Sequence, residues 1–87
     1  MNTQEQTEAL ERSLSLLQTL TNEQVTPRTL RKEANQIVHY LKDDLKSLDL
    51  KCSEVILKLE GFSEDPNIPA YSRTLIWQII GNLSTLS

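Results

Sequence analysis

Residues 63–78 read SEDPNIPAYSRTLIWQ, where a polar turn with two prolines leads into an apolar run that holds the only tryptophan of the chain. The same order of residue types occurs 42 positions earlier. The matched turn residues are an acid, a proline four positions later and an arginine four positions after that: Glu23, Pro27 and Arg31, then Asp65, Pro69 and Arg73. Apolar matches arise between any two helical hairpins, but matched turn residues are harder to obtain by chance. The sequence therefore predicts one helix–turn–helix unit that occurs twice.

Apolar residues recur every three to four positions through most of the chain, which is the spacing of one face of a helix. The sequence contains only two glycines and three prolines, so few connections interrupt this pattern. A length of 87 residues fits a single domain, residues 1–87. We expect four helices, at residues 3–20, 27–45, 50–60 and 69–86.

Three residues suggest how these helices begin, end and pack. Thr26 precedes a proline and is predicted to cap the second helix. Gly61 is predicted to end the third helix with a positive φ. Gly81 lies inside the fourth helix, where glycine costs up to about 1 kcal/mol relative to alanine. We therefore expect a neighbouring helix to pack closely against Gly81.

The matched turns also bear on the fold class. An acid and a proline that precede an arginine in the second helix resemble the pattern of HEAT-type helical repeats. Extended repeat arrays need about three units, and this chain has two. Two hairpins can instead close on each other and bury all four apolar faces together. The predicted fold is all-α, a four-helix bundle built from two similar helical hairpins.

The composition limits the compartment and the partners. A net charge of −3 opposes general affinity for nucleic acids or anionic membranes, although a local basic patch stays compatible with it. The single cysteine, Cys52, cannot form an internal disulfide, which favours a cytoplasmic location. Residues 1–9 show no secretory signal, and no apolar run approaches the roughly 18 residues of a membrane span.

Two stretches carry a resemblance to a known family: TPRTLRKEA at residues 26–34 and EDPNIPAYSRTLIWQI at residues 64–79. Through them the whole chain resembles uncharacterised archaeal protein family 0147, whose members are similarly short and helical throughout. The resemblance implies a small, all-α, intracellular archaeal protein. It implies no activity, because none is assigned to the family, and it supplies no catalytic residues.

A basic cluster, Arg28, Arg31 and Lys32, stands at the expected start of the second helix, where cations oppose the helix dipole. One interpretation is a contact with a phosphate or a nucleic acid. The other is an internal pairing of each arginine of the repeat with its turn acid. The repeat favours the internal pairing, and the predicted structural charge network consists of Arg31, Arg73, Glu23 and Asp65.

The sequence offers no convincing catalytic or metal-binding group. His39 and Asp43 have a spacing that suits two metal ligands, but a zinc site needs three or four convergent ligands. Cys52 falls on the expected core face, where a thiol is unreactive. The acids near the second hairpin turn are predicted to serve the turn rather than a cation: Glu60, Glu64 and Asp65. We therefore predict no enzyme activity, no cofactor and no metal.

Some apolar residues lie at the margin of the expected core faces or beyond it. The candidate partner-binding residues are Trp77, Leu75, Leu57 and Tyr40. Tryptophan and tyrosine often anchor protein interfaces, so these residues favour a small, non-catalytic, intracellular protein-interaction module, including a homodimer. The alternative is a nucleic-acid accessory protein that uses Arg28, Arg31, Lys32 and Arg73.

Overall fold

The computed structural model describes residues 3–87. Across these residues the secondary structure is entirely helical, as predicted. The four helices are α1 (Thr3–Asn22), α2 (Arg28–Lys42), α3 (Leu48–Ser63) and α4 (Ala70–Ser84).

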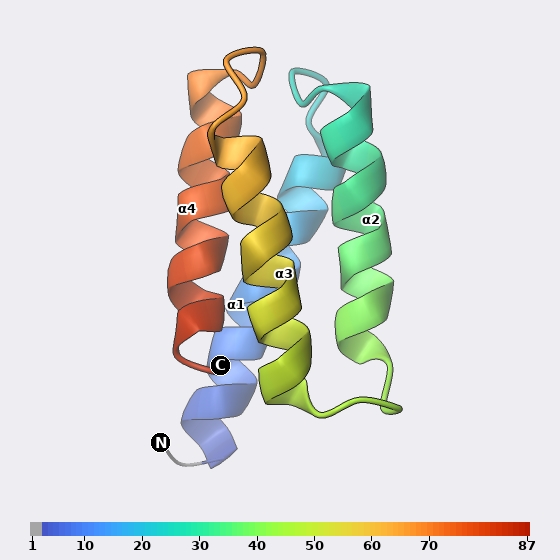
Figure 1. The fold of residues 1–87 in the computed structure, drawn as a ribbon, viewed down its shortest axis with the longest axis vertical. Coiled ribbons are helices and arrows are strands. Elements are labelled where there is room, and N and C mark those ends of the chain that lie inside the picture. Colours follow the sequence, from blue (N-terminus) through green and yellow to red (C-terminus); the bar gives the residue numbers. More distant parts are fainter. Residues whose placement is uncertain (1–2) are drawn as a thin grey trace.

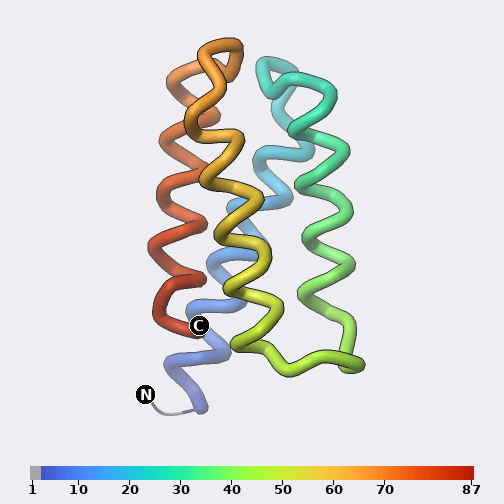
Figure 2. The backbone as a smooth tube through the Cα atoms, viewed as in Figure 1, coloured from blue at the N-terminus to red at the C-terminus, as the bar shows by residue number. Residues whose placement is uncertain are grey.

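The helices form a bundle in which α1 packs against α2 and α4, and α3 packs against α4. The α1–α2 and α3–α4 turns lie side by side at one end of the bundle (Figure 1). The α2–α3 connection and the described parts near both termini lie at the other end (Figure 2). The α2–α3 pair packs more loosely than the other three neighbouring pairs. In the part of the chain that the structure describes, no helix has the length and hydropathy that a membrane crossing requires.

The two hairpin turns have the same backbone conformation. Pro27 has φ −56° and ψ 147°, and Pro69 has φ −59° and ψ 152°. The N–H of Arg31 donates to the carbonyl of Pro27 at 2.9 Å, and the N–H of Arg73 donates to that of Pro69 at 3.0 Å. Each proline therefore stands just before its helix, where its missing N–H leaves no bond unmade.

The core also follows the 42-residue repeat. Leu17 and Leu59 are related by this shift and both are 0% exposed, as are Ala34 and Ile76. Both hairpins thus contribute the same helix faces to one apolar cluster. Its buried members are Ala9, Leu17, Leu20, Leu30, Ala34, Ile37, Val38, Leu41, Cys52, Val55, Leu59, Ile68, Leu75, Ile76, Ile79, Ile80, Leu83 and Leu86.

Three predictions about individual residues are wrong. Thr26 does not cap α2: its side chain is buried without a hydrogen-bond partner, at the position that Ile68 occupies in the second turn. Gly61 has no positive φ and lies inside α3, which continues to Ser63. Gly81 has open space where a Cβ would stand, so no neighbouring helix requires a glycine there.

The end of α2 differs from its prediction as well. The helix stops at Lys42, and Leu45 is 91% exposed outside it. Asp43 adopts an extended conformation, and its Oδ1 accepts the N–H of Leu45 at 2.9 Å. This local side-chain bond competes with further helical turns. α3 then begins at Leu48, two residues earlier than expected.

A buried lysine, which the helical spacing does not predict, also stabilises the end of α2. Lys51 in α3 is 4% exposed. Its Nζ donates to the carbonyl of Leu41 at 3.0 Å and to the carbonyl of Asp43. The last carbonyls of a helix lack partners within the helix, so Lys51 caps α2 from the neighbouring helix.

Candidate functional site

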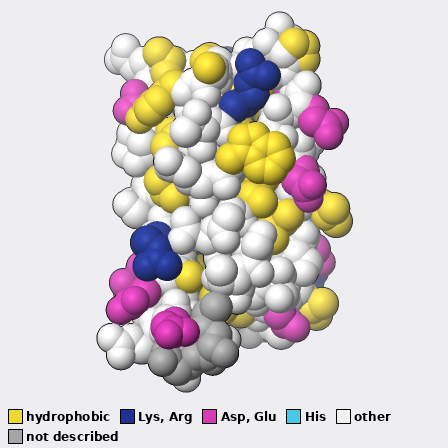
Figure 3. Space-filling view, turned by 90° about the vertical axis from the view of Figure 1, so that its left-hand side faces the viewer, with side chains coloured by type: hydrophobic (Ala, Val, Ile, Leu, Met, Phe, Trp, Pro, Cys, Tyr) yellow, Lys and Arg dark blue, Asp and Glu magenta, His cyan; other side chains and the backbone are white. Residues whose placement is uncertain are grey.

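Two predicted anchors lie on the outer face of the α3–α4 hairpin, which we call the α3–α4 outer face. Trp77 in α4 is 55% exposed and Leu57 in α3 is 71% exposed. Leu50, two helical turns before Leu57, is also exposed. Hydrophobic side chains gather at the centre of the side of the molecule that faces the viewer in Figure 3.

Both glycines of the chain belong to this face. Gly61 follows Leu57 by four residues and Gly81 follows Trp77 by four, so each lies one turn further on the same side of its helix. Both positions have open space beyond the Cα atom. The α3–α4 outer face therefore combines large apolar side chains with exposed helix backbone.

Leu75, the third predicted anchor, lies elsewhere. It is 6% exposed and belongs to the core cluster, so it cannot reach a partner in the folded protein. Leu75 and Trp77 are two residues apart and so point to sides of α4 about 160° apart. The apolar residues of α4 extend around more than one side of the helix. Because α1 and α4 pack closely together, one of these sides, which includes Leu75, is covered within the bundle itself.

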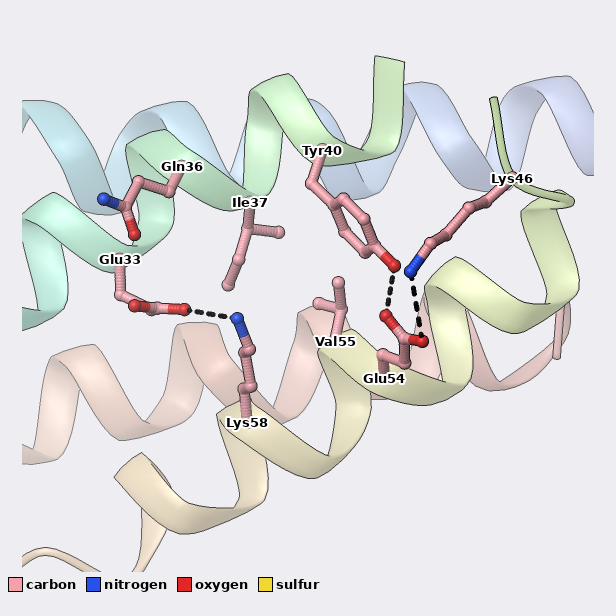
Figure 4. Close-up of a pocket in the computed structure, with 8 residues that line it drawn as sticks. All are labelled: Glu33, Gln36, Ile37, Tyr40, Lys46, Glu54, Val55 and Lys58. Carbon is pink, nitrogen blue, oxygen red and sulfur yellow. Dashed lines mark hydrogen bonds and ion pairs between the residues drawn. The ribbon is translucent and has the colours of Figure 1, made fainter. Parts of the chain in front are cut away.

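Tyr40, the fourth predicted anchor, is held by neighbours in the space between α2 and α3 (Figure 4). Its hydroxyl donates to Oε2 of Glu54, and the Nζ of Lys46 lies 5.5 Å from the ring centroid. Lys46 also forms an ion pair with Glu54 at 3.8 Å. The hydrogen bond to Glu54 raises the pKa of Tyr40, and the bond with Tyr40 together with the charge of Glu54 raises the pKa of Lys46.

A second ion pair connects α2 and α3, in which the Nζ of Lys58 lies 3.2 Å from Oε1 of Glu33. Between the two ion pairs, Ile37 and Val55 line a pocket of about 240 Å³ (Figure 4). Both carboxylates of this pocket, those of Glu33 and Glu54, face lysines. The arrangement therefore connects α2 to α3 through polar side chains.

The predicted charge network is not formed. Among residues 3–87 the ion pairs are Lys46–Glu54 and Lys58–Glu33, and neither Arg31 nor Arg73 takes part in one. Asp65 instead accepts the N–H of Asn67 at 2.9 Å, so its carboxylate serves its own turn. The Nε of Arg31 is buried without a partner.

The basic residues of α2 lie beside a polar groove between α1 and α2, which we call the α1–α2 groove. One part has a volume of about 550 Å³ and is lined by Thr21, Arg28, Arg31, Lys32 and Asn35. The adjoining part, of about 270 Å³, shares two of these residues and adds Gln18, Asn22, Val38, His39 and Lys42. Neither part is lined by a carboxylate.

The other candidate residues lie apart. His39 is exposed in the α1–α2 groove, whereas the carboxylate of Asp43 accepts a hydrogen bond within the turn after α2. Cys52 is buried, as predicted, and burial raises the pKa of its thiol. Glu60 and Glu64 are exposed. Within the described range of 3–87, no three His, Cys, Asp or Glu side chains are grouped to hold a metal ion.

These features define a small all-α bundle protein. The Uncharacterised protein family (UPF0147) matches residues 1–86, and the chain belongs to this family. A UPF0147 protein of Methanosarcina mazei is 33% identical over 86 residues, covering 99% of this chain and 92% of that protein. A UPF0147 protein of Aeropyrum pernix is 38% identical over 74 residues, covering 85% of this chain and 81% of that protein. The predicted family resemblance is confirmed.

Solved structures agree with the fold. The crystal structure of a UPF0147 protein from Thermoplasma acidophilum superposes with a TM-score of 0.93 at 32% identity, over 98% of this chain and 100% of that one. A second crystal structure, of a protein of unknown function, has a TM-score of 0.84 at 30% identity, over 93% of this chain and 92% of that one. The fold of this chain is therefore shared with a crystal structure from its own family.

Proposed function

We propose that this protein is a non-catalytic, intracellular interaction module that binds a protein partner through the α3–α4 outer face. The observation that carries the proposal is the exposure of Trp77 and Leu57 on one hairpin. The positions related to them by 42 residues in the other hairpin are Asn35 and Ser15, which suit water. The outer face of the α1–α2 hairpin is therefore polar at these positions, whereas the α3–α4 outer face is apolar at the matching ones.

The two exposed glycines support the same proposal. A helix-interior glycine lowers stability by about 1 kcal/mol relative to alanine, and inside the bundle nothing requires one at position 61 or 81. A glycine next to Leu57 or Trp77 does, however, allow a partner to approach the helix backbone. Large apolar anchors beside small residues offer shape as well as apolar area to a partner surface.

A second copy of the chain is the first partner to test. Trp77 is the only tryptophan, so its fluorescence reports directly on this face. On self-association we expect the mass from light scattering to rise with concentration and the emission to shift to shorter wavelengths. Trp77→Ser, followed by light scattering alone, should abolish the change in mass. Tyr71→Ser is the matched control, since Tyr71 is exposed on α4 about 120° around the helix from Trp77.

If the protein stays monomeric, a photo-crosslinking amino acid at position 57 tests for a different protein in the native host. A specific crosslinked product that is absent when the same group stands at position 15 supports the proposal. A strict monomer with no position-specific product overturns it.

A further inference from the structure

We propose that the α1–α2 groove binds the phosphate backbone of a nucleic acid duplex. This site lies on the opposite hairpin from the α3–α4 outer face and uses different residues. Each proposal can therefore fail without the other.

The first support is the alignment of cations along α2. They follow the three-to-four-residue spacing of one helix side, with Asn35 and His39 between them: Arg28, Arg31, Lys32 and Lys42. Residues 28 and 42 are 14 positions apart, which corresponds to about 21 Å along a helix. Phosphates of one duplex strand lie about 3.4 Å apart along its axis, so the row can follow several of them.

The second support is that these cations have no internal counterion. None of the four forms an ion pair with a described residue, and no acid occupies the first turn of α2. Arg28 and Lys32 are exposed at the positive end of the helix dipole, where cations are unfavourable. The Nε of Arg31 is buried without a partner, which adds a donor whose hydrogen bond is unmade. Negative charge from outside the molecule would compensate this arrangement.

The lining of the groove favours phosphate over a protein partner. Beside the cations it offers neutral hydrogen-bonding side chains from both helices: Gln18, Thr21, Asn22 and Asn35. Its one aliphatic side chain, Val38, is only 6% exposed, so the groove has no pocket for an apolar anchor. Phosphate contacts need only charge and donors. Among the lining residues His39 has the only aromatic ring, so the groove lacks the successive stacking platforms that hold a single strand, which favours a duplex.

The test is fluorescence anisotropy with labelled duplexes of DNA and of RNA, each about 20 base pairs long, which exceeds the reach of the groove. We expect binding at about 50 mM salt that weakens on the order of 100-fold by about 200 mM, as four phosphate contacts predict. The DNA and RNA arms show which duplex is preferred. A single strand of the same length should bind more weakly.

Matched variants locate the site. Lys32→Gln should weaken binding and lower the salt slope by about one, because one phosphate contact is lost. Arg73→Gln removes the same charge from the equivalent helix of the other hairpin and should leave binding unchanged. The double variant Arg28→Glu with Lys32→Glu should abolish binding while its circular dichroism spectrum stays that of the wild type, since both residues are exposed.

Three results overturn the proposal. They are the absence of duplex binding at about 50 mM salt, an equal loss of affinity in Arg73→Gln and Lys32→Gln, and equally tight binding of a poly-glutamate peptide at the same charge concentration. The last result would assign the groove to an acidic protein segment instead.

Discussion

The two interfaces between the hairpins are related by the 42-residue repeat, yet they are closed by different chemistry. The shift exchanges α1 with α3 and α2 with α4, so the α1–α4 interface corresponds to the α2–α3 interface. Leu16 and Leu75 in the first correspond to Lys58 and Glu33 in the second. The first pair joins the apolar core, and the second forms an ion pair at 3.2 Å.

Other residues related by the repeat also occupy matching places in the two interfaces. Arg12 donates to Asn82 at 2.9 Å across the α1–α4 interface, and the corresponding residues Glu54 and Tyr40 form a hydrogen bond across the other. Ala9 is buried in α1, where α3 has the buried Lys51. The hairpin repeat therefore specifies which positions meet, while the side chains at those positions decide how closely the helices pack. This explains why α2 and α3 pack more loosely than α1 and α4.

The largest expected difference between the interfaces concerns Leu75 and its counterpart Glu33. Leu75→Ala should lower the free energy of unfolding by about 2–5 kcal/mol, because it leaves a cavity in a closed interface. Glu33→Ala should cost about 1 kcal/mol or less, since its partner Lys58 is largely exposed. Urea unfolding of both variants measures the two values. Equal losses would contradict the distinction between the interfaces.

Lys51 provides the next largest effect. Lys51→Met keeps the aliphatic stem but removes the donor from two carbonyls at the end of α2, and it should cost about 1–3 kcal/mol. Lys58→Met, seven residues later on the same helix, is the control and should cost about 1 kcal/mol or less. Amide hydrogen exchange should show that the last turn of α2 opens more readily in Lys51→Met. Unchanged protection there would exclude the capping role.

A sharper comparison replaces the ion pair of the α2–α3 interface by an apolar pair like that of the α1–α4 interface. The double variant Glu33→Leu with Lys58→Leu should gain about 1 kcal/mol, because replacing an ion pair by well-packed apolar side chains often stabilises a protein. Lys58→Leu alone should be less favourable, since it leaves Glu33 without its cation. A double-mutant cycle in urea separates these terms. A double variant less stable than wild type would show that the ion pair is needed.

The smallest expected effect is a change in protein stability at alkaline pH, and it depends on Tyr40. Its pKa is raised in the folded state, so the folded protein retains the phenol proton more strongly than the unfolded chain does. This contribution is fully present below the ordinary tyrosine pKa of about 10 and is lost as pH rises through the folded pKa. The stability difference between wild type and Tyr40→Phe should therefore shrink above about pH 10. Urea unfolding at neutral and alkaline pH tests this, and a constant difference would disprove the link.

The sequence predicted part of the candidate surfaces as well as the fold. Helical spacing predicts Trp77 at one margin of the core face of α4 and Leu57 on the side of α3 nearly opposite Val55, and both are exposed. The spacing predicts Leu75 at the opposite margin of α4 from Trp77, and it is buried, because helical periodicity places a residue on a side of its helix without showing which neighbour covers that side. Arg31 was expected to pair with Glu23, but a spacing along the chain does not fix the direction of a long, flexible side chain.

The sequence by itself determined the helical content, the doubled hairpin and the core face of each helix. These follow from local spacing and from the gain in burying apolar surface, which depends little on the exact neighbours. Tertiary structure alone decided the ends of α2 and α3, the burial of Lys51 and the unequal closure of the two interfaces. Those outcomes depend on where one helix places its side chains against the backbone of another, and this geometry exists only once the chain has folded.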